Sequence, residues 1–147
     1  MSRDTCALMI AVLGSIASSS IAHGAAATLQ VSEAWVPVAD KVGSDVPLLL
    51  IVHNETDTAD ALLRVRCPVA NFSERHTTDR GEGAPAMRSV PSIPIAANST
   101  TVLKADGYHI MLLQTRQPLA AGDRFICAID FQKAGTIETE VNVRKSR

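Results

Sequence analysis

The stretch RFICAIDFQKAGTIETEVNV, residues 124–143, decides the fold. Its first half places Phe125, Cys127, Ile129 and Phe131 at every second position, and side chains two apart on a strand share one face. Its second half alternates apolar residues with Thr, Glu and Asn, which is typical of a strand with one buried and one wet face. Gly135 joins the halves, so the stretch predicts two paired strands.

Working outward from this pair, short β-rich runs recur between Pro, Gly and Asp residues, and helical periodicity is nearly absent. A continuous apolar run at 48–53 predicts a strand buried on both faces, and an Asp-Gly turn at 106–107 predicts a hairpin between strands at 100–105 and 108–114. The other strands are expected at 29–38, 61–67, 72–76 and 87–90. About eight short strands indicate an all-β, antiparallel sandwich or barrel in a single domain.

The N-terminus reads as a cleaved secretory signal peptide over residues 1–27. A short basic start at Arg3 precedes an apolar run at 6–16 and small residues at 22–27. The apolar run is too short to span a bilayer, so we expect a secreted protein with no transmembrane segment. The remaining chain, 28–147, fits one domain.

Composition limits the classes of partner. The net charge is −1, aromatic residues make up 3% of the chain, and basic residues do not cluster. We therefore expect no nucleic-acid binding and no electrostatic attachment to membranes. Nothing in the sequence combines a nucleophile with a base in a supporting context, so we expect no enzymatic activity.

Two cysteines, Cys67 and Cys127, lie outside the leader, and both fall on the apolar face of their strands. In an oxidising compartment such a pair is a disulfide candidate. Two buried free thiols are the alternative, and the wide separation without a CxxC spacing argues against a metal role.

The candidate site is a set of two histidines and two methionines. His76 is followed after ten residues by Met87, then after twenty-one residues by His109, and after one more by Met111. Outside the leader these are the only methionines, although each residue alone is more often a core or surface residue. Thioether sulfur selects Cu(I) and imidazole suits copper, so the set predicts one Cu(I) ion per chain. His53 stands apart from this set and is interpreted as a structural histidine.

The spacing His76-x10-Met87-x21-His109-x-Met111 resembles the signature of the PCuAC family of periplasmic copper chaperones. Ala34-Trp35-Val36 and the segment ADGYHIML (105–112) are also similar to that family, as are the turns at 118–123 and 131–135. The resemblance implies a cupredoxin-like barrel and delivery of Cu(I) to a recipient, such as a cytochrome oxidase subunit or another copper chaperone. We expect a monomer.

The chain departs from the family in two places. Family members often carry an aromatic residue where Pro47-Leu48-Leu49 stands, and some carry a Met- and His-rich C-terminal tail that this chain lacks. A second copper site is therefore not expected. A metal buffer that does not deliver copper and a β-sandwich that binds a protein partner without metal are the alternative functions.

Overall fold

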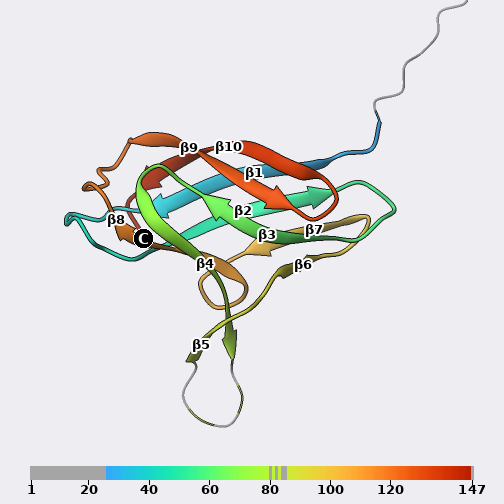
Figure 1. Ribbon diagram of the computed structural model, residues 1–147, viewed down its shortest axis with the longest axis horizontal. Helices are drawn as coiled ribbons and strands as arrows, with labels where there is room; N and C mark the ends of the chain where they lie inside the picture. Colours follow the sequence, from blue (N-terminus) through green and yellow to red (C-terminus); the bar gives the residue numbers. More distant parts are fainter. Residues whose placement is uncertain (1–25, 80, 82, 84–85, 147) are drawn as a thin grey trace, which may run out of the picture.

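The computed structural model describes residues 26–79, 81, 83 and 86–146, and these residues form ten strands (Figure 1). The expected leader lies outside the described residues except for Ala26 and Ala27. In the described part of the chain no helix is long and apolar enough to cross a membrane. The strands are β1 Leu29–Pro37, β2 Val46–Asn54, β3 Asp60–Arg66, β4 Ala70–Asp79, β5 Ala86–Ser89, β6 Ile93–Ile95, β7 Ser99–Leu103, β8 His109–Thr115, β9 Arg124–Phe131 and β10 Gly135–Arg144.

The strands follow the order β5-β4-β8-β2-β1-β10-β9-β3-β6, and β7 also pairs with β2. All pairings between them are antiparallel except that of β1 with β10, which is parallel. The inward side chains of the strands form one hydrophobic core. The expected all-β, cupredoxin-like single domain is confirmed, with one parallel pairing added to an otherwise antiparallel arrangement.

The hairpin at the end of the chain forms as its alternation predicts. Strand β10 pairs with β9 from Gly135 opposite Phe131 to Asn142 opposite Arg124, and Gly135 has a φ of 77° that favours glycine. Cys127, Ile129 and Phe131 are buried in the core. Strand β2 is less enclosed than expected, because only alternate residues from Val46 to Asn54 are buried and those between them are half-buried.

The expected hairpin around Asp106-Gly107 is wrong. Strands β7 and β8 both run antiparallel to β2 along the same edge, with Leu103 opposite Leu50 and Ile110 opposite Leu48. The two strands therefore continue one another along β2 as a single interrupted strand, and residues 104–108 form a loop between them. The turn is local, because the Gly107 amide donates to the Lys104 carbonyl, but β2 pairs with both flanking segments.

Strand β3 contains an irregularity that the alternation did not predict. Strict alternation back from Cys67 puts Leu63 on the inward face, but Leu62 is fully buried and Leu63 is exposed. The pairing with β9 shifts register between Leu62 and Arg64, so the side-chain alternation changes at that point. The three-residue strand β6 was also not predicted, since its Pro94 interrupts the β-rich pattern.

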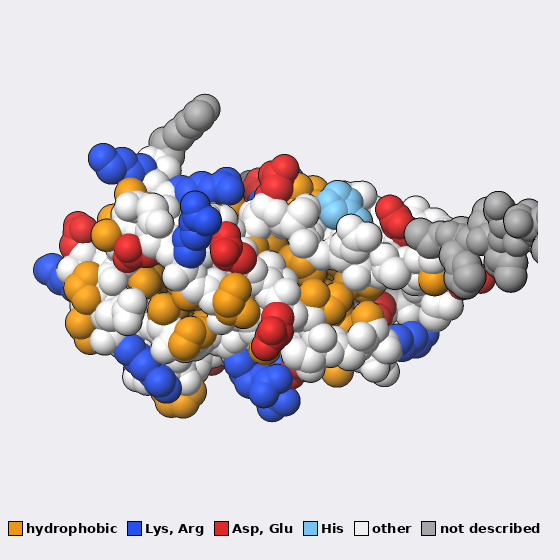
Figure 2. All heavy atoms as spheres, turned by 90° about the horizontal axis from the view of Figure 1, so that it is seen from above, with side chains coloured by type: hydrophobic (Ala, Val, Ile, Leu, Met, Phe, Trp, Pro, Cys, Tyr) orange, Lys and Arg blue, Asp and Glu red, His pale blue; other side chains and the backbone are white. Residues whose placement is uncertain are grey.

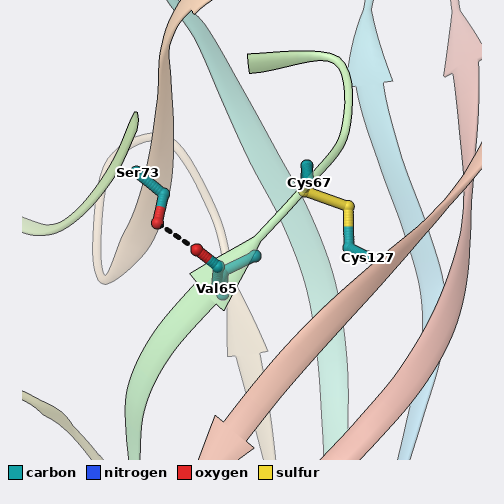
Figure 3. The surroundings of a disulfide bond; sticks show 4 residues. All are labelled: Val65, Cys67, Ser73 and Cys127. Atoms are coloured by element: carbon teal, nitrogen blue, oxygen red, sulfur yellow. Dashed lines mark hydrogen bonds between the residues drawn. A yellow bond between two sulfur atoms is a disulfide. The ribbon is translucent and has the colours of Figure 1, made fainter. Parts of the chain in front are cut away.

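The disulfide between Cys67 and Cys127 is present (Figure 3). Cys67 directly follows β3, and the pairing of Arg66 with Ala128 brings it opposite Cys127 with the Cα atoms 4.4 Å apart. Near the bridge, the Ser73 hydroxyl of β4 donates to the Val65 carbonyl of β3. The bridge joins β3 to β9, and the contact of Ser73 with Val65 joins β3 to β4.

Candidate metal centre

The four candidate ligands lie on three adjacent strands, β5, β4 and β8. His76 of β4 is directly opposite His109 of β8 on one side and Ser89 of β5 on the other. Residues directly opposite each other, and residues two apart on one strand, point to the same face of a sheet. Met111 is two residues from His109, and Met87 is two residues from Ser89, so the register places all four side chains on one face.

His109 is held in a fixed orientation. It is 1% exposed, and its strand is anchored by the fully buried Ile110 and Leu112 on the opposite face. Its Nδ1 lies 3.0 Å from the Gly107 carbonyl oxygen, which can only accept a hydrogen bond. Nδ1 therefore carries the proton, and Nε2 of the neutral ring keeps a lone pair for a metal ion.

His76 lies against His109, with the ring centroids 5.6 Å apart and the ring planes perpendicular. Its Nε2 is 2.9 Å from a carboxylate oxygen of Glu74, and its Nδ1 is buried with no hydrogen-bond partner in the described part of the chain. A buried nitrogen without a partner is costly in a protein interior unless another atom binds it. The orphaned Nδ1 beside a second imidazole is the feature of this structure that best fits a metal ligand.

Glu74 supplies the charge next to the site. The hydrogen bond from His76, followed by the one from the Ser89 hydroxyl, lowers the pKa of the Glu74 carboxyl from its usual value. Both hydrogen bonds go to the same carboxylate oxygen, at 2.9 and 3.2 Å. Glu74 is directly opposite Met111 in the β4–β8 pairing, so this carboxylate is on the ligand face.

Met87 is the most exposed of the four residues. Its strand β5 is exposed along its whole length, and Met87 itself is 59% exposed. The hairpin of β4 and β5 extends away from the body of the molecule (Figure 1). On the reverse face of this hairpin Arg88 and Asp79 form an ion pair at 2.6 Å. The structure therefore brings His76 and His109 together, places Met111 beside them, and leaves Met87 on the exposed edge.

The candidate site can hold a metal ion only if the thioether sulfurs of Met87 and Met111 act as ligands beside the two histidines. Among the described residues, no group of three or more His, Cys, Asp or Glu side chains could hold a metal. Two imidazole nitrogens and two thioethers make a soft, uncharged set, which suits Cu(I) and is poorly matched to Mg²⁺ or Ca²⁺.

Sequence reasoning placed His53 correctly and missed Glu74 and Ser89. The two His53 ring nitrogens face the Ser32 and Thr100 hydroxyl oxygens at 2.9 and 3.2 Å, as expected for a structural histidine. Glu74 is two residues before His76, a spacing that puts both on one face of a strand, so the sequence did contain a signal for it. Ser89 could be found only from the β4–β5 register.

On the face seen in Figure 2, the described acidic and basic side chains are interspersed among apolar ones and form no single basic patch. That distribution agrees with the absence of basic clusters in the sequence.

Comparisons with known proteins agree with the fold. The family described as "LpqE-like: Putative lipoprotein LpqE-like" matches residues 29–143. A relative called "Putative lipoprotein Lxx21020", from Leifsonia xyli subsp. xyli (strain CTCB07), is 30% identical over 118 residues, which are 79% of this chain and 69% of that protein.

Two solved structures illustrate the likeness. The "Copper-bound PCuAC domain from PmoF2" has a TM-score of 0.70 at 17% identity, with 81% of this chain and 94% of that domain covered. The "Solution structure of CuI-DR1885 from Deinococcus Radiodurans" has a TM-score of 0.63 at 25% identity, with 86% and 84% covered. The expected resemblance to the PCuAC family is confirmed.

Proposed function

The chain belongs to the LpqE-like family, and we propose that it is an extracytoplasmic chaperone that binds one Cu(I) ion through His76, Met87, His109 and Met111. The observation that carries this proposal is the meeting of His76 and His109, each with one ring nitrogen left to bind a metal, on the strand face that also bears both methionines. Solved proteins of the same fold are described as copper-bound and as a Cu(I) form, which supports the choice of metal.

The ligand set suits a carrier that must release its cargo. Imidazole and thioether ligands add no charge, so Cu(I) is held less firmly than by thiolates, which are also prone to oxidation outside the cytoplasm. The two histidines and Met111 lie on strands attached to the core, whereas Met87 is on the exposed hairpin. An incoming ligand of the recipient would therefore displace the Met87 thioether first, and further incoming ligands would replace the remaining three one at a time.

The disulfide and the family description support a compartment outside the cytoplasm. The Cys67–Cys127 disulfide suits an oxidising compartment, and the family and the relative are both described as lipoproteins. We propose a periplasmic location reached through the leader at 1–27. The recipient would be a copper protein such as a cytochrome oxidase subunit or another copper chaperone, with the chain acting as a monomer and performing no catalysis.

Anaerobic competition titration with a colorimetric Cu(I) chelator tests this function. We expect one tight equivalent for residues 28–147 and its loss in a Met87→Ala, Met111→Ala double variant. Phe72→Ala is a matched control, because Phe72 is also exposed and lies on the same face of β4 but carries no ligand atom. Binding that is absent, or indifferent to the two methionines, would refute the proposal and favour a metal-free interaction module.

A cell-based comparison separates delivery from storage. If the protein delivers copper, a strain lacking it should lose oxidase activity at low copper supply and recover that activity when copper is added. Loss of copper tolerance with intact oxidase activity would instead indicate a metal buffer.

A further inference from the structure

We infer that Glu74 is a positioning residue that holds the His76 ring so that Nδ1, and not Nε2, binds the metal. The metal-binding part of this inference rests on the proposed function. The orientation of the ring in the metal-free protein does not, and it can be measured separately.

The proton on His76 is fixed by the chemistry of its partner. An ionised carboxylate has no hydrogen to donate, so the 2.9 Å contact requires Nε2 of His76 to carry the proton. In the neutral ring the lone pair is then on Nδ1. This is the nitrogen that is buried and has no hydrogen-bond partner among the residues that the structure describes.

The carboxylate is itself held in place from a second strand. The Ser89 hydroxyl of β5 donates to the same Glu74 oxygen at 3.2 Å, while Glu74 and His76 both belong to β4. The His76 side chain is 13% exposed and that of Glu74 is 50% exposed. The carboxylate therefore holds the ring from the solvent side and leaves Nδ1 enclosed.

The two histidines then bind through different nitrogens. His109 donates from Nδ1 to the Gly107 carbonyl and binds through Nε2, whereas His76 donates from Nε2 to Glu74 and binds through Nδ1. A carboxylate is a hard ligand and is poorly suited to bind Cu(I) directly. As an acceptor of the ring N–H it raises the basicity of the imidazole and places a negative charge close to a site whose own ligands are neutral.

NMR spectroscopy of the metal-free protein tests the first half of the inference. Long-range ¹H–¹⁵N correlations at neutral pH should show His76 as the Nε2–H tautomer in the wild type. In Glu74→Ala the ring should become a mixture of tautomers, and Glu74→Gln, whose amide oxygen can still accept the N–H, should restore most of the Nε2–H form. Glu138→Gln, an exposed carboxylate on β10, is the control and should change nothing.

Addition of Cu(I) tests the second half. The ¹⁵N resonance of His76 Nδ1 and that of His109 Nε2 should shift, while the Nε2–H proton of His76 remains. Cu(I) affinity should fall about 10- to 100-fold in Glu74→Ala and by less in Glu74→Gln.

The outcomes separate this inference from the proposed function. A wild-type Nδ1–H tautomer, an unchanged tautomer in Glu74→Ala, or a Cu(I) shift at His76 Nε2 would each overturn the inference, even if copper binds tightly. Conversely, loss of the single tautomer in Glu74→Ala would uphold the positioning role of Glu74 even in a protein that binds no Cu(I), and only the chaperone function would then be refuted.

Discussion

Single hydrogen bonds decide which atoms of this protein remain to bind something else. A backbone carbonyl at Gly107 and a carboxylate at Glu74 each accept one imidazole proton, and each leaves the other nitrogen of its ring without a proton. His53 shows the opposite case, since both of its nitrogens face hydroxyl groups. Within the described part of the chain, the same side chain therefore has both ring nitrogens in contact with hydroxyl groups at His53, but only one nitrogen hydrogen-bonded at His76 and at His109. The difference lies in the partners that surround each ring.

Asn54 shows how much one buried polar side chain contributes to stability. It is 2% exposed, its amide donates to the Thr58 and Ala96 carbonyls at 3.0 Å, and its oxygen accepts from the amide and hydroxyl of Thr56. Asn54→Ala removes four hydrogen bonds made by an enclosed side chain, so we expect a loss of about 2–3 kcal/mol in the free energy of unfolding. Urea denaturation measures it.

Asn71→Ala serves as the control for that substitution, because Asn71 is exposed and water can replace its contacts with Gln114 and Arg116. We expect it to change the free energy of unfolding by less than about 0.5 kcal/mol. If both variants lost the same free energy of unfolding, the enclosed hydrogen bonds of Asn54 would contribute no more to stability than exposed ones.

At the scale of strands, the sequence predicted elements well and their partners less well. The alternation at 124–131 and 136–143 identified β9 and β10, since each strand has one buried face and pairs with its neighbour in the chain. The turn at Asp106-Gly107 was misread, because a local turn signal does not reveal that β2 pairs with both flanking segments. The burial of Leu62 depends on a register shift that the residue pattern does not contain.

The candidate site divides in the same way. The four candidate ligands come from spacing and from the resemblance, and the alternation of β8 correctly put His109 and Met111 on one face. That His76 faces His109 could not be predicted, since it depends on the pairing of strands far apart in the chain. The link from Glu74 to Ser89 likewise depends on the β4–β5 register.

The exposed β4–β5 hairpin gives Met87 a different expected effect from Met111. Because Met87 is on an exposed edge strand, we expect its thioether to be the first of the proposed ligands to leave. Stopped-flow transfer of Cu(I) to a chelator should therefore show faster release in Met87→Ala, with only a moderate loss of affinity. Met111→Ala, which removes a proposed ligand from a strand anchored in the core, should cause the larger loss of affinity. The reverse order would contradict this assignment of roles.

Asp130 joins three strands and predicts part of the acid response. The Thr136 hydroxyl, followed by Arg64 and Arg66, lowers the pKa of the Asp130 carboxyl from its usual value. The folded state thus favours the ionised form of Asp130. The stability that this carboxylate contributes is therefore complete above the ordinary pKa near 4, and it is lost as the pH falls through the lowered folded-state pKa.

We expect Asp130→Asn to cost on the order of 1 kcal/mol at pH 7, since both arginines are exposed, and to cost less at low pH. Thermal unfolding followed between pH 2 and pH 7 measures this, with Glu55→Gln, an exposed carboxyl in the turn after β2, as the control. A cost that stays constant over this range would exclude the carboxylate as its source.

At the scale of the whole molecule, the disulfide stabilises the fold that positions the candidate site, although neither cysteine belongs to that site. The Cys67–Cys127 bridge closes a loop of 60 residues between β3 and β9, and that loop contains β4, β5 and β8. Cross-linking such a loop restricts the unfolded chain by about 4 kcal/mol in the chain-entropy model, and measured losses on removal are typically 2–5 kcal/mol. We therefore expect a Cys67→Ala, Cys127→Ala double variant to lose about 2–4 kcal/mol in the free energy of unfolding.

The same variant should keep its Cu(I) affinity in conditions where it remains folded, because neither sulfur of the bridge is a candidate ligand and the β4–β8 pairing does not include either cysteine. Urea denaturation and Cu(I) competition on one preparation measure both quantities. If the double variant were as stable as the wild type, the bridge would add no restriction to the unfolded chain, which would then already be ordered without it. A loss of affinity in the folded variant would mean that the bridge, through the contact between Ser73 and Val65, sets the position of β4 and with it that of His76.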